Sequence, residues 1–430
     1  MGRAKVERVR KQYVNPEGGP VTAGVDDSQQ TLFGQNEDFH RYWQEWQGMP
    51  EFVQGDLEPN SAIIVNFAAP EDRKAFASLV DQKLTPYTRS IWYPKAVEAA
   101  MMDKRWRSWS LRPPRHPVYI VSKGRWDTKR RLTDRVLDRM GVPHFIVVEE
   151  SEVELYRHHA TRSATVIVLD PAYQRDYDAC DDLGMTKGKG PGPARNFAWD
   201  HAISSGARWH WVMDDNITYF YRFNRNLHIP VVDGTPFTVM EDFAARYGNV
   251  TMVGPNYFMF VPRKQRVPPY VLNTRIYSCN LIRNAAPYRW RGRYNEDTDI
   301  SLRMLKDGWV TVQYNAFTQH KLPTQTVEGG NTEEFYAQEG TKPKSEMLRR
   351  LHPDVTEVVW KWGRWHHQVD YKPFRVNQLR FREGLERPAG TDEYGLVLER
   401  RDEYGNWVPE LSRRWDNEMP LGDLQIGMGM

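Results

Sequence analysis

Apolar and amphipathic stretches alternate along the chain from Pro117 onward, and this alternation predicts repeated strand–helix units. Short apolar runs bounded by turn residues predict strands at 118–121, 144–149, 165–169 and 209–213. Apolar residues at helical spacing predict helices at 128–140, 153–159 and 193–205. Strands that alternate with helices favour an α/β fold of Rossmann type, with a mostly parallel sheet and helices on both faces.

After Asn216 the pattern is less regular, and it predicts a mixture of further elements. A strand is predicted at 218–223, and the stretches 250–261 and 270–282 are predicted to be antiparallel strands at the sheet edge. Helical spacing is predicted at 238–247 and 296–306. The last strand of the unit, 310–319, ends at His320.

The flanking regions differ in composition and indicate separate parts. A small N-terminal β-α-β module is predicted from strands at 61–67 and 89–93 around a helix at 70–80. A Pro-rich stretch at 111–117 marks a boundary. The expected organisation is a mobile tail over 1–30, the N-terminal α/β module over 31–110 and the main domain over 117–340. A Trp/Arg-rich C-terminal extension with a polar, peripheral end follows over 341–430.

Composition excludes several classes of protein. No apolar stretch is long enough to span a bilayer, and the charged N-terminus does not resemble a secretory signal. Cys180 and Cys279 are the only cysteines, which argues against a disulfide framework or a cysteine-based zinc site and fits a reducing compartment. The formal net charge of +3 names no partner by itself.

Positive charge is concentrated at 86–131, where Lys and Arg outnumber Asp and Glu by twelve to three and aromatic residues are interspersed. Such a stretch suits a phosphate backbone with exposed bases, although a solvated linker would have the same composition. The Trp-rich stretch 360–368 is a second candidate for contacting nucleic acid; a cap on the core explains it slightly better. These stretches leave a DNA partner open.

Asp214-Asp215-Asn216 follows the strand 209–213 and is the strongest candidate for chemistry. Ligands of open α/β sheets bind outside the carboxyl ends of strands, where two acids can hold a divalent cation and, through it, a diphosphate. A helix cap or an Asx-turn uses the same residue types. His320, at the end of the last strand, could complete a three-residue site for Mn²⁺ or Mg²⁺.

Two basic loops are candidates for binding a nucleotide. Ser122-Lys123-Gly124-Arg125 follows the first strand, and its glycine permits a close backbone approach while its cations can reach phosphates. A Gly/Lys/Pro loop with Lys187 and Lys189 then leads into a helix that carries Arg195 and Asn196 in its first turn. A helix N-terminus with an attached cation favours an anion, although plain turns and an ordinary cap remain alternatives.

Glu296 and Asp297 begin a helix and are candidates for a general base that takes a proton from an acceptor alcohol. Asp299, two positions further on, is expected to face elsewhere. Acids in a first helical turn also suit the helix dipole, so this position has a purely structural explanation as well.

The order of Ser122-Lys123-Gly124-Arg125, Gly192-Pro193-Ala194-Arg195-Asn196 and Asp214-Asp215-Asn216 resembles that of the TET-associated glycosyltransferases of phages, which have a GT-A-type fold. The resemblance covers Pro117 to His320. It implies transfer of a sugar from a nucleotide sugar, expected to be a UDP-sugar, to 5-hydroxymethylcytosine in phage DNA, in the host cytoplasm.

The resemblance also implies roles for individual residues. Asp214-Asp215-Asn216 stands in for the donor motif, so that Asp214 and Asp215 are both candidates for the metal and Asp214 also for the donor. Glu296 and Asp297 match the acids that supply the base, and His320 matches a late metal ligand. The donor would be held by Ser122, Lys123, Gly124, Arg125, Lys189, Arg195, Asn196 and Asp214.

Three other functions remain open at this point. A glycosyltransferase of the same fold could act on a glycan, a protein or a small molecule and would need no DNA surface. A non-catalytic phage DNA-binding protein would keep the basic stretch 86–131 but has no use for Asp214, Asp215 and Glu296 together. A nucleotidyltransferase would use a similar acid pair with two metals, and no clear third strand-end carboxylate is present for it.

Overall fold

The computed structural model describes most of the chain and all of the predicted main domain except short gaps. The predicted tail, 1–30, lies outside the described residues, as does Lys187. The described segments are 40–54, 61–93, 101, 103–110, 113–127, 129–181, 189–263, 265–322, 341–361 and 363–410.

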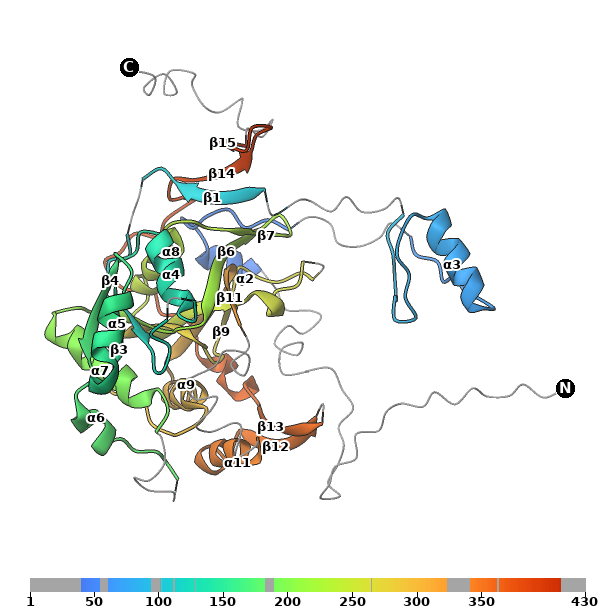
Figure 1. Ribbon diagram of the computed structural model, residues 1–430. Helices are drawn as coiled ribbons and strands as arrows, with labels where there is room; N and C mark the ends of the chain where they lie inside the picture. The colour runs from blue at the N-terminus through green and yellow to red at the C-terminus, as the bar shows by residue number, and fades with distance from the viewer. Residues whose placement is uncertain are drawn as a thin grey trace, which may run out of the picture.

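A ten-stranded sheet forms the centre of the molecule (Figure 1). Its strands follow the order β4-β3-β2-β5-β10-β8-β11-β6-β7, and β9 pairs with β11. The bounds are β2 Val118–Val121, β3 His144–Val148, β4 Ala164–Val168, β5 Trp209–Asp214, β6 Ile217–Asn224, β7 Leu227–Pro230, β8 Val250–Tyr257, β9 Tyr270–Leu272, β10 Cys279–Arg283 and β11 Val310–Lys321.

Strand direction in this sheet is mixed, but one direction dominates. The strands β4, β3, β2 and β5 are parallel to one another. The strand β10 runs antiparallel to both of its neighbours, β5 and β8, and β11 runs parallel to β8. Seven strands therefore share a direction, namely β4, β3, β2, β5, β8, β11 and β7, and their carboxyl ends lie at one edge of the sheet.

Helices cover both faces of the sheet, as the alternation of buried residues requires. Val118, Ile120 and Trp211 point to one face, where they pack against α4 and α8. Tyr119 and Val212 point to the other face, against α7 and α9. The bounds are α4 Leu132–Arg139, α5 Val153–His159, α6 Pro171–Arg175, α7 Gly192–Ser204, α8 Thr235–Ala245 and α9 Glu296–Lys306, with short 3₁₀ turns at Glu150–Glu152 and Phe258–Phe260. The prediction of an α/β fold with a mostly parallel central sheet is confirmed.

One part of that prediction is wrong. The stretches 250–261 and 270–282 were expected as antiparallel edge strands, but β8 lies inside the sheet between β10 and β11 and is parallel to β11. The strand β10 is antiparallel and also internal. Residues of β8 are buried on both faces, which a continuous apolar run cannot distinguish from an edge hairpin when partner strands are unknown.

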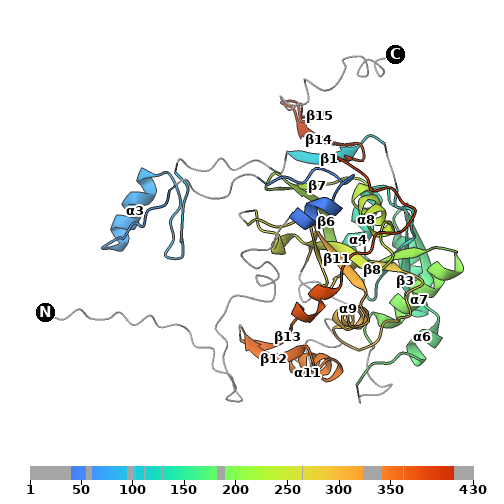
Figure 2. The same cartoon turned by 180° about the vertical axis from the view of Figure 1, so that it is seen from behind.

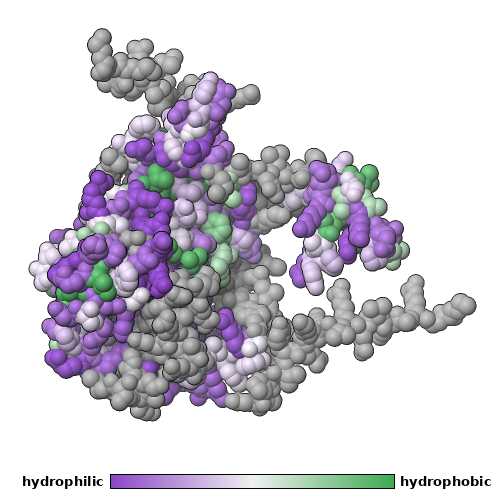
Figure 3. Space-filling view, in the orientation of Figure 1, coloured by the Kyte–Doolittle hydropathy of each residue, from purple (hydrophilic) through white to green (hydrophobic). Residues whose placement is uncertain are grey.

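The predicted N-terminal β-α-β module is not formed. Its helix is present as α3 Pro70–Leu79, but 61–67 and 89–93 make no strand, and Ile63 and Ile64 are 86% and 90% exposed. Figure 1 shows α3 and its flanking segments apart from the main body, and Figure 3 shows apolar side chains on their surface. Without a partner strand, apolar β-type residues have nothing to pair with.

Described segments on both sides of the predicted main domain pack against its core. Trp46, Met49 and Phe52, next to α2 His40–Glu45, join the central core, with α2 visible from behind in Figure 2. Tyr394 and Leu396 are also buried in that core, so the predicted peripheral position of the polar end does not hold there. A small sheet joins the segment before the main domain to the segment after it through β1 Lys104–Ser108, β14 Leu396–Arg401 and β15 Trp407–Pro409.

The first part of the predicted C-terminal extension packs beside α9. It comprises α11 Lys342–Leu351, the hairpin β12 Thr356–Lys361 and β13 Arg364–Val369, and a 3₁₀ turn at Lys372–Val376. Leu348 of α11 packs with Leu302 and Leu305 of α9. Because α9 carries two of the predicted catalytic acids, this contact brings the extension close to the predicted site.

Candidate active site

A cavity of about 330 Å³ lies at the edge of the sheet where six of the seven strands of common direction, all but β7, end. Each of these strands supplies its last residue, or for β4 the next one, to the lining: Val121, Val148, Leu169, Asp214, Tyr257 and Lys321. Further lining comes from the loop after β2, the turn after β5, α6, residues 277–278, the starts of α7 and α9, and from α11 and β13. Ligands of open α/β sheets bind at this position.

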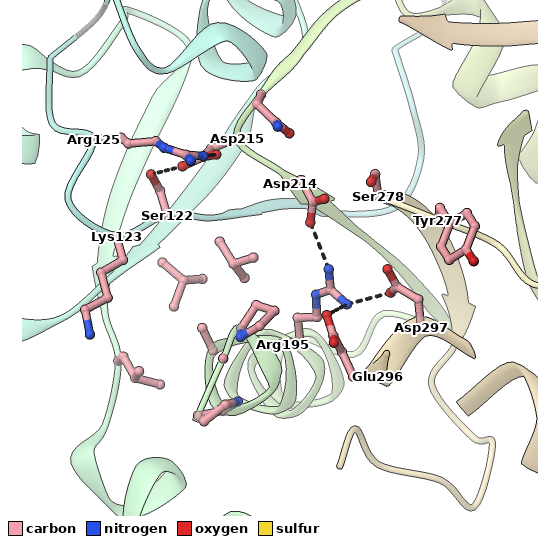
Figure 4. A pocket seen from close by; sticks show the side chains of 18 of the residues that line it. Ser122, Lys123, Arg125, Arg195, Asp214, Asp215, Tyr277, Ser278, Glu296 and Asp297 are labelled. Atoms are coloured by element: carbon pink, nitrogen blue, oxygen red, sulfur yellow. Dashed lines mark hydrogen bonds and ion pairs between the residues drawn. The ribbon is translucent and has the colours of Figure 1, made fainter. Parts of the chain in front are cut away.

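The first turn of α7 forms one wall of the cavity. Gly192 begins this helix against Tyr177, where a Cβ atom would overlap the phenol ring. The hydroxyl of Tyr177 donates to the backbone carbonyl of Gly292 at 2.8 Å and fixes the ring in place. Arg195, in the same helical turn, is 2% exposed and points toward the acids of the cavity (Figure 4).

On one side of the cavity, Asp215 connects the end of β5 to the loop that follows β2. Its carboxylate accepts a hydrogen bond from Ser122 Oγ at 2.6 Å and pairs with the guanidinium of Arg125. Tyr156 of α5 joins this cluster, because its hydroxyl lies 2.8 Å from Ser122 Oγ and accepts from the Arg125 backbone N–H at 3.0 Å. Burial raises the pKa of Asp215, and Arg125 opposes that rise. Both carboxylate oxygens of Asp215 are thus engaged.

Asp214 faces the other side and is held between two cations. Its Oδ1 accepts from Arg195 at 2.8 Å and its Oδ2 from Lys321 Nζ at 2.6 Å. Burial would raise the pKa of Asp214, but Lys321 and Arg195 outweigh it and hold that pKa below its usual range. Lys321 also donates to Ser278 Oγ at 2.7 Å, and Ser278 lies 2.8 Å from the hydroxyl of Tyr257.

Glu296 and Asp297 meet Arg195 from the start of α9 (Figure 4). The guanidinium Nη1 of Arg195 lies 2.6 Å from Asp297 Oδ1 and 3.2 Å from Glu296 Oε1. Burial raises the pKa of Asp297 to about 7; Arg195 opposes this rise, while Glu296 and Asp214 add to it. A carboxyl group with a pKa near neutrality can exchange a proton at working pH, which suits a general base.

The structure brings together eight of the predicted site residues in the lining of this cavity: Ser122, Lys123, Arg125, Arg195, Asp214, Asp215, Glu296 and Asp297. Lys123 is half-exposed and lies 3.2 Å from Glu149, another lining residue. Asp299 faces away, as expected, and pairs with Arg291, Arg303 and His352.

Four predicted residues are not in the lining. Gly124 donates its backbone N–H to Glu152 at 2.9 Å, and the Nζ of Lys189 lies 3.3 Å from the backbone carbonyl of Arg175. The side-chain amide of Asn196 donates to the backbone carbonyl of Trp290 at 2.9 Å and accepts from the backbone N–H of Trp290 at 2.8 Å. Trp290 in turn packs over the guanidinium of Arg195, whose carbon lies 4.5 Å from the ring centre. Asn196 therefore acts on the site through the position of Arg195.

His320 is the fourth, and it is turned away from the cavity. Its Nδ1 hydrogen-bonds with Thr218 Oγ1 at 2.5 Å. The pairing of β11 with β6 shifts register between His320 and Lys321, so that Thr218 is an unpaired extra residue. The extra residue belongs to β6, whereas His320 and Lys321 are consecutive in β11. Because side chains alternate along a strand, Lys321 enters the cavity and His320 points away from it.

The sequence reading missed several lining residues, among them Tyr257, Ser278, Lys321, Lys344 and His367. Tyr257 and Lys321 end strands of the common direction, but the predicted strands ended at other residues, so the rule that led to Asp214 pointed to His320 instead. Lys344 and His367 come from α11 and β13 and carry no local motif. Burial lowers the pKa values of both side chains, and Glu296 opposes that shift at Lys344.

The predicted Mn²⁺ or Mg²⁺ site does not fit this arrangement of side chains. Among the residues that the structure describes, no three His, Cys, Asp or Glu side chains are grouped so that they could hold a metal ion. Both oxygens of Asp214 and both of Asp215 are already engaged with Arg, Lys or Ser donors. His320 lies outside the cavity lining.

The fold and the cavity define an α/β protein whose cluster of paired cations and carboxylates lies at the carboxyl ends of its strands. The profile of one family, described as TET-Associated Glycosyltransferase, matches residues 116–330. That match covers half of the chain and all six strands that end at the cavity. The chain belongs to the TET-associated glycosyltransferase family and is a glycosyltransferase.

Other comparisons add little. No curated protein matches the chain. Among solved structures, it resembles a mannose-1-phosphate geranyltransferase from Thermus thermophilus with 10% sequence identity and a TM-score of 0.24. That similarity covers 55% of this chain and 64% of the other. Across the described residues, none of the helices combines the length and apolar character needed to cross a membrane.

Proposed function

We propose that this enzyme transfers a sugar from a nucleotide sugar, expected to be a UDP-sugar, to the hydroxymethyl oxygen of 5-hydroxymethylcytosine in phage DNA. The reaction would take place in the cytoplasm of the infected host. The observation that carries the proposal is the contact of Arg195 with Asp214, Glu296 and Asp297 within one strand-end cavity. This contact combines a cation for a leaving diphosphate with acids that can take a proton.

The two ends of the cavity suit the two parts of a nucleotide sugar. One end has apolar side chains from the ends of β2, β3 and β4, namely Val121, Val147, Val148 and Leu169, with Lys123 beside them. Apolar walls with few polar groups fit the base and ribose of a nucleoside. The other end holds Arg195, Lys321 and the acids, which suit the diphosphate and the sugar.

The proposed chemistry is a displacement at the anomeric carbon of the sugar. The hydroxymethyl oxygen of the acceptor forms a bond to that carbon, and the bond from the same carbon to the diphosphate oxygen breaks. The electron pair of the broken bond stays on the diphosphate, where Arg195 offsets the developing charge. Asp297 or Glu296 takes the hydroxyl proton of the acceptor.

DNA as the acceptor is supported by the composition and exposure of the predicted basic stretch. Trp109 is 64% exposed and Trp126 is 38% exposed, both within 86–131. Exposed aromatic side chains among cations can stack on bases and hold a phosphate backbone. A duplex base would have to leave the stack to reach an enclosed cavity, at a cost of a few kcal/mol.

The test is to incubate the purified protein with an oligonucleotide that contains 5-hydroxymethylcytosine and with a panel of nucleotide sugars. Mass spectrometry of the digested nucleosides should show a hexose added to the modified base only. An oligonucleotide with unmodified cytosine is the matched substrate control, and Asp297→Asn protein is the enzyme control. Transfer to a glycan, protein or small-molecule acceptor, with none to DNA, would refute the DNA part of the proposal. No transfer to any acceptor, together with salt-sensitive DNA binding, would refute the proposal as a whole.

A further inference from the structure

Lys321 occupies the position in the cavity where the metal prediction would place an ion. It is the last residue of β11, its side chain is 14% exposed, and its Nζ lies 2.6 Å from Asp214 and 2.7 Å from Ser278. A lysine ammonium group has three N–H donors. The two hydrogen bonds that the structure gives for Lys321 Nζ use two of them, which leaves one for an oxygen of a bound substrate.

A divalent ion at Asp214 would have to displace a buried cation. One oxygen of Asp214 is taken by Arg195 and the other by Lys321. Separating Lys321 from Asp214 would remove the carboxylate that the structure gives as the ion-pair partner of this buried ammonium group, which costs several kcal/mol. A divalent ion at Asp215 would likewise have to compete with Arg125 and Ser122, which engage its two oxygens.

We propose that Lys321 is a catalytic residue that contacts the leaving diphosphate and supplies the positive charge expected from a metal, so that transfer requires no divalent ion. This inference rests on the proposed use of a nucleotide-sugar donor. As the sugar–oxygen bond breaks, the electron pair stays on the diphosphate, and the third N–H of Lys321 donates a hydrogen bond to it. No proton leaves Lys321 in this step.

The surroundings of Lys321 keep it charged and fixed in position. Burial would lower its pKa, but Asp214 outweighs burial and holds that pKa above its usual range. Asp214 therefore positions a cation and has no need to bind a metal. Ser278 and Tyr257 extend the network behind Lys321, with a distance of 2.8 Å between their hydroxyl oxygens. A charge fixed before the reaction starts needs no reorganisation when the leaving group develops its charge.

The first test measures nucleotide binding with and without metal. Wild-type protein is titrated calorimetrically with UDP, GDP, ADP, CDP and dTDP, and with the matching monophosphates, in EDTA and again with Mn²⁺. We expect one diphosphate to bind in EDTA more tightly than its monophosphate, with a Kd that Mn²⁺ changes less than about threefold. Glycosyl transfer measured with that nucleotide's sugar should also persist in EDTA.

The second test uses variants of Lys321. Lys321→Met should weaken the diphosphate by about 10- to 100-fold, the size of a charge-assisted hydrogen bond, and leave the monophosphate nearly unchanged. Lys321→Arg keeps the charge and should retain most of the difference between the two ligands. Lys372→Met, which removes an exposed lysine outside the cavity, is the matched control. A purely structural Lys321 would weaken both ligands alike.

The outcomes separate this inference from the proposed function. Diphosphate binding and transfer that occur only with Mn²⁺ would overturn the role of Lys321 and leave the proposed function intact. Equal weakening of diphosphate and monophosphate by Lys321→Met would also overturn it. If no nucleotide binds under either condition, the proposed donor fails and this inference fails with it. If Lys321→Met does not fold, the wild-type metal comparison and Lys321→Arg still decide.

Discussion

Asp214 and Asp215 are neighbours in the chain, but they belong to two different sides of the cavity. On the Asp215 side, Arg125 and Ser122 form a closed cluster that links the loop after β2 to the end of β5. On the Asp214 side, Arg195 and Lys321 connect to the acids at the start of α9. The Asp215 side therefore holds the loop after β2 against the end of β5, and the Asp214 side contains the groups that can act on a substrate.

The difference follows from the geometry of a strand end. Asp214 is the last residue of β5 and Asp215 is the first residue of the turn that follows. The two carboxylates have separate partners and do not form one site. A pair of aspartates in sequence resembles a metal site only when both can face the same ion. Here each aspartate pairs with a different arginine. We therefore expect substitutions on the Asp214 side to affect activity and substitutions on the Asp215 side to affect stability.

The largest effect is expected from removing the base on the Asp214 side. Asp297→Asn should lower kcat by about 10²- to 10⁴-fold, the usual contribution of a positioned general base, with little change in melting temperature. The measurement is steady-state transfer with the thermal melting curve of each protein. Asp354→Asn, at an exposed carboxyl that pairs with Lys306, is the matched control. If Glu296→Gln is inactive while Asp297→Asn is not, the proton goes to Glu296.

The next effect is on stability and tests the Asp215 side. Asp215→Asn removes the carboxylate that forms a buried ion pair with Arg125 and should lower the free energy of unfolding by about 3–5 kcal/mol. Urea denaturation measures this, with Asp354→Asn as the reference. The folded fraction should keep far more activity than Asp297→Asn. A stable but inactive Asp215→Asn protein would contradict the structural role given to this side.

A smaller effect is expected from pH. Because burial raises the pKa of Asp297 to about 7, this base is ionised above that pH and protonated below it. The rate of transfer should therefore be constant above pH 7 and fall by about tenfold per unit of pH as the pH decreases below it. Rate profiles for wild-type protein and Asp297→Asn test this, since the variant should lose the inflection. An inflection that survives in the variant would assign it to another group.

The smallest effect is expected at His320, next to Lys321. His320 lies outside the cavity lining, so His320→Ala should change diphosphate affinity by no more than about twofold, within the range of substitutions away from a site. Calorimetric titration in the presence and absence of Mn²⁺ measures it. A large loss of affinity that appears only with Mn²⁺ would restore His320 as a metal ligand.

Local patterns in the sequence were enough to predict most of the central sheet. The strands near 118, 144, 165 and 209, and the helices that follow them, occur where apolar periodicity predicted them. The same patterns identified Arg195, Asp214, Glu296 and Asp297, which the structure brings into one cavity. These predictions succeed because strand ends and helix starts are marked locally, by turn residues, glycine, proline and acids.

Predictions that depended on partners were less successful. The stretch 61–67 has the composition of a buried strand, but it has no neighbour to pair with and is exposed. Strand β8 reads like an edge strand, but it is internal because β10 and β11 flank it. A buried strand and an exposed segment can have similar composition, and so can an internal strand and an edge strand. Only the partner strands distinguish them.

What the sequence determined by itself is the α/β class, the order of its main elements and the residue types of a sugar-transfer site. The tertiary structure decided which of these residues face each other. Asp214 ends β5 and Asp215 begins the turn after it, each with its own partners, and the alternation of side chains along β11 directs Lys321, and not His320, into the cavity. A shift of one residue in strand register reverses which side chain faces a site, and pairing between distant strands sets that register.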